Sequence, residues 1–106
     1  MIIREFLDIN TKSPFAKWFN ELNDIAAAKV TAALYRLEQE NYSNVKSVDK
    51  GVLEYKIDFG PGYRIYFGKD GQELIILLGG GSKKNQSKDI KLAKRHWLFY
   101  KQAKQK

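Results

Sequence analysis

The sequence predicts an α+β fold, because two kinds of hydrophobic periodicity occupy separate parts of the chain. Apolar residues recur at helical spacing through residues 14–37, whereas residues 53–67 alternate apolar and polar side chains as half-buried strands do. Helical spacing returns in residues 87–104. The chain has 106 residues, 43% of them hydrophobic, which suits one packed domain over residues 1–106.

The N-terminal third predicts a strand followed by two helices. Residues 2–8 begin with β-branched and aromatic side chains, which favour a short strand. Ser13 and Pro14 suit the N-cap and the first position of a helix, since proline has no N–H to lose there. Asn23 and Asp24 interrupt that helix, and Asp24 is expected to cap a second one. The two helices together form a predicted helical hairpin.

The middle of the chain predicts a loop and then three strands. Residues 41–51 are polar and are expected to form a loop. The turn signals Gly60-Pro61-Gly62 and Asp70-Gly71 separate the strands that follow. An unbroken apolar run predicts that the last strand is central and covered on at least part of both faces. The glycines after it are expected to let the chain leave the strand sharply. These strands are expected over residues 53–59, 63–67 and 74–78.

The last helix is expected to begin after Ser87, which can cap it. Trp97 lies on the apolar stripe of this helix and Trp18 on that of the first helix, and we interpret both as core residues. The predicted order is therefore β-α-α-β-β-β-α. It predicts a mainly antiparallel sheet with the helical hairpin on one face and a basic C-terminal helix.

Positive charge is concentrated at the C-terminal end. Residues 1–82 carry ten Lys or Arg and eleven Asp or Glu, a net charge of −1, whereas residues 83–106 carry nine Lys or Arg and only Asp89, a net charge of +8. A local positive field attracts polyanions and releases their counterions on binding. The alternative interpretation is a solvated tail that only aids solubility.

Composition excludes several classes of site. The chain has no cysteine and a single histidine, His96, so we expect neither disulfides nor a metal site, and no cofactor. The N-terminus lacks a cationic start followed by a long apolar run, so no signal peptide is expected. No apolar stretch reaches the roughly 20 residues of a membrane span. We therefore expect a cytoplasmic protein that has no membrane partner.

Strand alternation predicts a cluster of polar groups on one open sheet face. With a turn at residues 60–62, Asp58 falls opposite Arg64 and Lys56 opposite Tyr66, and a slip of one residue would break this sorting. Arg64 could then clamp a phosphate, while Lys56 or Glu54 could move a proton, which suits phosphodiester chemistry without metal. The alternative is a set of ordinary cross-strand salt bridges, worth about 0.2–1 kcal/mol each.

The segment Gly79-Gly80-Gly81-Ser82-Lys83-Lys84 resembles a phosphate-binding loop only loosely, because the GxxxxGK[ST] spacing is absent. Its lysines are nevertheless expected at the edge of the open face. His96 lies among lysines on the last helix, and we interpret it as a surface residue, with a catalytic role as the alternative.

Two stretches of the chain carry a family resemblance. These are EYKIDFGPGYRIYF at residues 54–67 and LLGGGSKKNQSKDI at residues 77–90. They resemble the RelE/ParE toxin superfamily, most closely its phage-derived, HigB-like branch of addiction-module killer proteins. The resemblance runs from the helical hairpin to the last helix. It implies the RelE-like fold and a toxin encoded beside an antitoxin that has a helix-turn-helix.

The resemblance also implies an activity and its residues. RelE-like members cut mRNA on the ribosome without metal, through attack of a 2′-hydroxyl on the adjacent phosphate. Arg64 then matches the phosphate and transition-state ligand, and Lys56 matches a proton acceptor or charge stabiliser. Glu54 matches the branch pattern and is a third catalytic candidate. The residues expected to bind RNA are Lys83, Lys84, Tyr66, Gln86 and Lys91.

Two points stay open at this level. Well-known family members place a catalytic Tyr or His late in the chain, and the spacing of His96 and Tyr100 does not match them. ParE-type relatives share the fold and poison DNA gyrase without enzymatic activity, so the fold does not choose the target. The sequence therefore predicts a ribosome-dependent mRNA endonuclease that inhibits translation, with a gyrase poison as the alternative.

Overall fold

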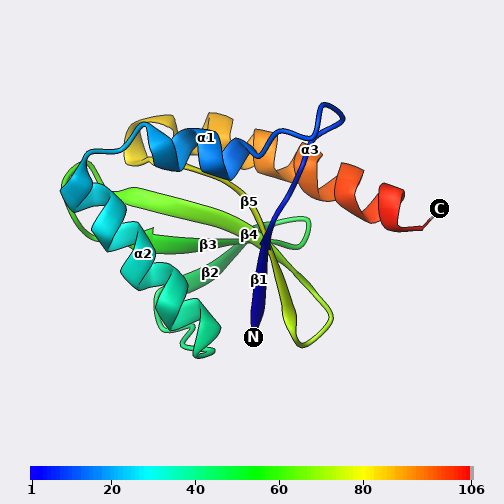
Figure 1. The fold of residues 1–106 in the computed structure, drawn as a ribbon, viewed down its shortest axis with the longest axis horizontal. Coiled ribbons are helices and arrows are strands. Elements are labelled where there is room, and N and C mark those ends of the chain that lie inside the picture. The colour runs from blue at the N-terminus through cyan, green and yellow to red at the C-terminus, as the bar shows by residue number, and fades with distance from the viewer. Residues whose placement is uncertain (106) are drawn as a thin grey trace.

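The computed structural model describes residues 1–105 and contains a five-stranded sheet and three helices (Figure 1). The strands are β1 (Ile2–Glu5), β2 (Val45–Asp49), β3 (Val52–Ile57), β4 (Tyr63–Asp70) and β5 (Leu74–Ser82). The helices are α1 (Pro14–Asn20), α2 (Asp24–Glu38) and α3 (Gln86–Lys104), and a 3₁₀ turn, η1 (Lys83–Asn85), leads into α3. The α+β class predicted from the sequence is confirmed.

The sheet is mixed, with the strand order β1-β5-β4-β3-β2. Strand β1 runs parallel to β5, while the other neighbours pair in antiparallel fashion. The predicted order lacked β2, because residues 41–51 were expected to form a loop. Strand β2 lies at the edge and leaves Lys46, Ser47 and Asp49 exposed, so its sequence shows little apolar signal. Lys50 and Gly51, both with positive φ, make its tight turn into β3.

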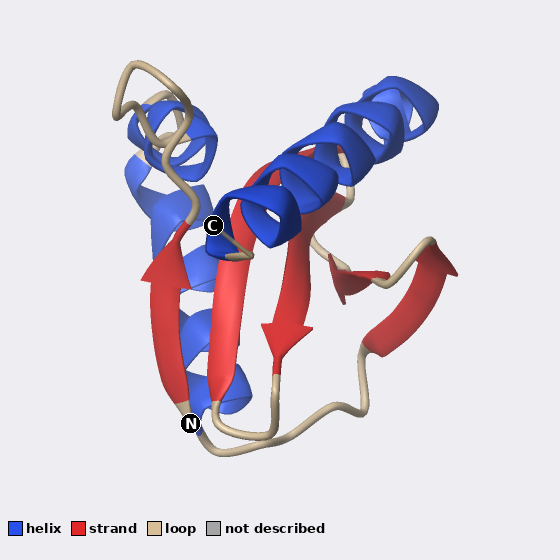
Figure 2. Ribbon diagram, turned by 90° about the vertical axis from the view of Figure 1, so that its right-hand side faces the viewer, coloured by secondary structure: helices blue, strands red, loops and turns tan. Residues whose placement is uncertain are grey.

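Helices cover both faces of the sheet. Helices α1 and α2 pack on one face, in a core that includes Phe15, Leu37 and Phe67. Helix α3 lies across the other face, where Trp97 is part of a second core. Figure 2 shows α3 in front of the sheet and α2 behind it. Strand β5 is an interior strand between β1 and β4 and is covered on both faces, as its apolar run predicts.

The helix starts agree only in part with the sequence. The Ser13 side chain accepts a hydrogen bond from the Ala16 N–H and caps α1, as predicted. Asn23, and not Asp24, caps α2 through the Ala26 N–H. Ser87 lies inside the first turn of α3 and does not cap it, because the helix begins at Gln86, directly after η1.

The glycine run does not end β5, as the sequence had suggested, because the strand continues to Ser82. Two of these glycines instead permit close packing on opposite faces. A Cβ at Gly80 would collide with the Trp18 ring of α1, and a Cβ at Gly81 would collide with the Asp89 carboxyl group of α3. The missing side chains therefore let both helices approach the sheet.

Across residues 1–105, no helix combines the length and the apolar character needed to cross a membrane.

Candidate functional site

Helix α3 covers part of the polar sheet face that was predicted to be open. The prediction is therefore wrong for Glu54, Arg64 and Tyr66, while Lys56 and Asp58 are exposed as expected. Glu54, Arg64 and Tyr66 are only 1%, 5% and 1% exposed. The helix covers this face because its apolar stripe needs a partner, and Val52 and Ile76 of the sheet provide one. Sequence alternation identified which residues share the face, but it could not show that a distant helix lies over it.

The hairpin register also differs from the predicted one. Lys56 lies opposite Arg64, and Glu54 lies opposite Tyr66. The predicted pairing was displaced by two residues, because the loop spans residues 58–62 and is longer than assumed. A shift of two residues leaves every side chain on its original face. Lys56 and Arg64 are therefore direct cross-strand neighbours on one face. Lys56 is exposed there, whereas Arg64 is buried.

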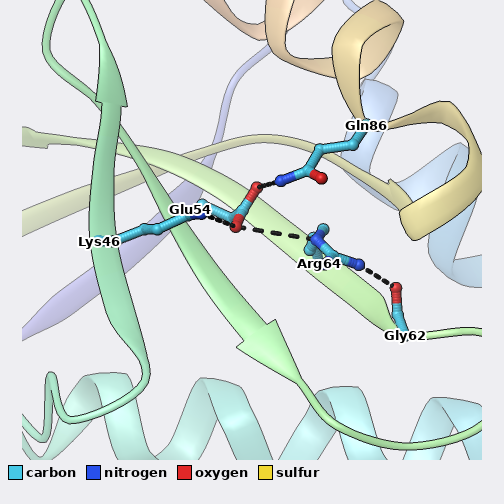
Figure 3. A network of polar contacts seen from close by, with 5 residues as sticks. All are labelled: Lys46, Glu54, Gly62, Arg64 and Gln86. Atoms are coloured by element: carbon cyan, nitrogen blue, oxygen red, sulfur yellow. Dashed lines mark hydrogen bonds and ion pairs between the residues drawn. The ribbon is translucent and has the colours of Figure 1, made fainter.

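Glu54 is the centre of a polar network (Figure 3). The Gln86 side chain donates a hydrogen bond to Glu54 Oε2 at 2.8 Å. Arg64 Nε lies 3.7 Å from Glu54 Oε1, and Lys46 Nζ lies 3.9 Å from the same oxygen. The carboxylate therefore meets one buried and one exposed cation while the start of α3 holds it from above. A buried carboxylate needs such compensation, because desolvation disfavours its charge.

Arg64 connects this network to the β3–β4 turn. Its Nη1 donates to the Gly62 carbonyl at 2.6 Å, and the Lys83 N–H donates to the same oxygen at 2.9 Å. Gly62 has a φ of 77°, which only glycine adopts readily, and its Gly60-Pro61-Gly62 turn is confirmed. One carbonyl thus joins the guanidinium to the backbone from which the Lys83 side chain extends.

Two acidic groups near the network are poorly compensated. The Tyr66 hydroxyl and Asp89 Oδ2 are buried, and neither has a hydrogen-bond partner within the described chain. Burial raises the pKa of the Asp89 carboxyl above its ordinary value, with Lys88 opposing the shift. Burial also raises the pKa of the Tyr66 phenol, and the charges of Glu54 and Asp89 add to that effect. The hydroxyl of Tyr66 therefore stays protonated at neutral pH.

The open part of this region is a cleft of about 470 Å³ lined by the start of β2 and by β3. Lys46, Glu54, Lys56 and Asp58 line it together with Asn44. Lys56 is exposed and forms no ion pair within residues 1–105. We define the β3 cleft by these residues. An anion that entered it would meet the exposed ammonium groups of Lys46 and Lys56, beside the carboxylates of Glu54 and Asp58.

The other residues predicted to bind RNA occupy different environments. Lys83 and Lys84 are exposed on η1, close to Gly62. The Tyr66 ring is buried beneath α3, so it offers no stacking surface, and Gln86 is engaged with Glu54. Lys91 lies further along α3, in a separate groove.

His96 is not the surface residue that the sequence suggested. It is half-buried, and its ring lies 4.8 Å from that of Phe6. Burial lowers the pKa of the His96 imidazole, and its buried Nε2 has no partner among the described residues. Tyr100, the other late candidate, donates to Asp70 at 2.6 Å. Both side chains serve the packing of α3 in this arrangement.

Sequence reasoning missed two residues at the site, Lys46 and Asp89. Lys46 lies on β2, the strand assigned to a loop, so nothing placed it opposite Glu54. Asp89 had a signal, since it is the only acidic residue among the last 24 residues. In residues 1–105, no three His, Cys, Asp or Glu side chains gather as metal ligands would.

The fold and this geometry define the class of the protein. It is a small α+β protein with a mixed sheet and a buried polar network around Glu54 and Arg64. The chain matches the model of the family "Phage derived protein Gp49-like (DUF891)" over residues 17–97. It is 43% identical, over 89 residues, to an uncharacterized protein of Haemophilus influenzae, covering 83% of this chain and 90% of that protein. The chain belongs to the Gp49-like family, which is a RelE/HigB-like toxin family.

Proposed function

We propose that this protein is the toxin of a type II toxin–antitoxin pair and that it cleaves mRNA on the ribosome without metal. The observation that carries the proposal is that Lys56, Arg64 and Lys83 lie at the same end of the sheet. They come from β3, from β4 and from the turn that follows β5, and the Gly62 carbonyl joins two of them. Cations clustered in this way suit a phosphodiester.

The proposed reaction uses the substrate's own nucleophile. The 2′-oxygen attacks the adjacent phosphorus, the bond from phosphorus to the 5′-oxygen breaks, and a 2′,3′-cyclic phosphate forms. The 2′-hydroxyl proton passes to a base and the leaving 5′-oxygen takes up a proton. In this scheme Lys56 accepts the proton or stabilises charge, Arg64 binds the phosphate, and Lys83 and Lys84 hold the RNA strand.

The burial of Arg64 sets a condition on this scheme. Its guanidinium reaches a phosphate only after it leaves the Gly62 carbonyl and η1 moves aside. The Gln86–Glu54 hydrogen bond, at 2.8 Å, closes the same region and would break in that movement. RNA binding therefore has to supply the free energy that opens the site. Glu54 then either remains the partner that orients Arg64 or takes part in proton transfer.

Expression in growing bacteria tests the proposal. We expect growth arrest with new mRNA 5′ ends inside translated codons. Lys56→Ala and Lys83→Ala should relieve arrest and cleavage without unfolding the protein, since both side chains are exposed. Lys17→Ala, which removes an exposed lysine from α1, is the matched control and should change neither. Arrest with intact mRNA and DNA cleavage complexes would contradict the proposal and support a gyrase poison.

A toxin of this kind acts in the cytoplasm and requires an antitoxin. The family supports that partner, and we propose that it is a small helix-turn-helix protein encoded beside this chain. Co-expression of the neighbouring reading frame should restore growth.

A further inference from the structure

A second cationic surface lies beside α3, apart from the β3 cleft. It is a groove of about 580 Å³ between α3 and the β2–β3 turn. Its charged lining consists of Lys50, Lys91, Lys94, Arg95 and Lys101. Only Lys94 is neutralised in the described chain, by Asp49 at 2.8 Å. We call this surface the α3 groove, and it carries four uncompensated positive charges.

The floor of the α3 groove is apolar. Leu98 is 54% exposed and lies between the lysines, whereas Trp97 is 6% exposed. Tyr100 stacks on the Trp97 ring at 5.3 Å with an interplanar angle of 6°, and Lys101 Nζ lies 5.7 Å from its centroid. The lining therefore offers an exposed aliphatic side chain but no free aromatic face.

This combination distinguishes between two kinds of anionic partner. Single-stranded RNA gains much of its affinity when bases stack on exposed aromatic rings. The α3 groove lacks such a ring, so an RNA strand would leave Leu98 uncovered. An amphipathic helix instead inserts aliphatic side chains into a groove and places charged residues at its margins. The exposed Leu98 and the four free cations match that pattern.

The walls of the α3 groove are held in place before any partner arrives. The Lys94–Asp49 ion pair ties α3 to β2. A Cβ at Gly51 would lie only 3.0 Å from Trp97 Nε1, so the β2–β3 turn packs closely on α3. Lys91, Lys94, Leu98 and Lys101 follow at steps of three or four residues and share one helix face. A preformed groove loses little conformational entropy on binding.

We propose that the α3 groove docks an acidic amphipathic helix of a partner protein. Apolar residues of that helix would cover Leu98, and Asp or Glu at its margins would face Lys50, Lys91, Arg95 and Lys101. The partner we infer is the antitoxin, so this inference rests on the proposed toxin role. It needs no nuclease activity, because the groove is separate from Lys56 and Arg64.

A binding experiment with the full chain tests this inference. The probe is a fluorescent synthetic helix of about 20 residues, long enough to be helical, with Leu on one face and Glu at its margins. We expect saturable binding by anisotropy. A scrambled peptide of identical composition should bind at least about tenfold more weakly, since its Leu and Glu no longer segregate. Equal binding of the two peptides would overturn the inference.

Variants locate the binding surface. Leu98→Ser and the double variant Lys91→Glu/Lys101→Glu should each weaken peptide binding about tenfold or more. The matched control Lys12→Glu/Lys17→Glu makes the same charge change away from the groove and should retain binding. Circular dichroism checks the fold, which should persist because the altered side chains are exposed. Unchanged peptide binding by both groove variants would overturn the inference.

Binding of an oligouridylate probe tests the alternative that the α3 groove binds single-stranded RNA. If Leu98→Ser weakened oligouridylate binding and left peptide binding intact, the groove would be an RNA surface and the inference would be wrong. Failure of the two proposals is distinguishable. Loss of mRNA cleavage with intact peptide binding contradicts the nuclease alone, and cleavage without peptide binding contradicts the docking surface alone.

Discussion

The two faces of the sheet are covered by helices in different ways. Under α1 and α2 the buried sheet residues are apolar, such as Tyr55, Ile65 and Phe67. Under α3 the core is apolar near Trp97, but Glu54 and Arg64 are buried where the helix begins. One face therefore gains stability from burial alone, while the other keeps a charged pair that desolvation penalises. Because the Glu54–Arg64 pair is kept despite its desolvation cost, we look for function on the face under α3.

The apolar face should give the largest loss of stability. Phe67→Ala removes a fully buried ring and should lower the free energy of unfolding by about 3–5 kcal/mol. Urea denaturation followed by circular dichroism measures this change. Ile25→Ala, at an exposed position on α2, is the control and should have little effect. A loss below about 1 kcal/mol for Phe67→Ala would mean that this face is less tightly packed than the structure indicates.

The polar face should respond through an uncompensated charge. Arg64→Met keeps much of the side-chain volume but removes the buried cation beside Glu54, so that only the exposed Lys46 remains near the carboxylate. We expect a loss of about 3 kcal/mol, the lower end for a broken buried pair, because the two groups are 3.7 Å apart and share no hydrogen bond. The double variant Arg64→Met/Glu54→Gln should recover part of this loss. An additive double variant would show that the pair is not coupled.

The close approach of α1 to β5 predicts a smaller effect. Gly80→Ala places a methyl group against the Trp18 ring and should cost about 1–3 kcal/mol through overpacking. Gly79→Ala is the matched control, since a Cβ there meets nothing within 4 Å. Thermal unfolding of both variants provides the measurement. Equal midpoints for the two would show that α1 adjusts freely to the sheet.

Removal of the charge of Asp89 should increase the stability of the folded protein, because its carboxyl group is partly buried. Its pKa is raised on folding, so its contribution favours the folded state below about pH 3.8 and is lost as the pH rises through the folded-state pKa. Asp89→Asn should therefore stabilise the protein at pH 7 by less than about 1 kcal/mol. The gain should vanish in acid, and urea midpoints at pH 7 and pH 3.5 test this. A loss at pH 7 would show that the carboxylate has a stabilising partner.

The smallest expected effect concerns His96, where α3 meets Phe6. Burial lowers the pKa of His96 below its ordinary value of 6.5, while Asp8 opposes the shift and Arg95 adds to it. The unfolded chain therefore takes up this proton first as the pH falls. Stability should decrease from pH 7 towards pH 5. His96→Gln should flatten that dependence, and an unchanged slope would exclude His96 as its source.

Much of the fold follows from local sequence signals. The helical spacing before Leu37, the Ser13 cap and the Gly60-Pro61-Gly62 turn each predicted an element that the structure contains. Strand β2 escaped prediction because an edge strand needs no apolar alternation. The grouping of Glu54 with Arg64 was predictable, since side chains alternate along a strand and neighbouring strands keep their faces together.

The sequence by itself determined which residues share the polar face of the sheet and that the C-terminal segment is basic. Only the tertiary structure decided that α3 covers that face, that Gln86 closes over Glu54, and that the β3 cleft and the α3 groove are separate. The physical reason is that strand period and charge are local properties of the chain. The position of α3 depends instead on contacts between distant segments, such as the packing of Trp97 against Gly68 of β4.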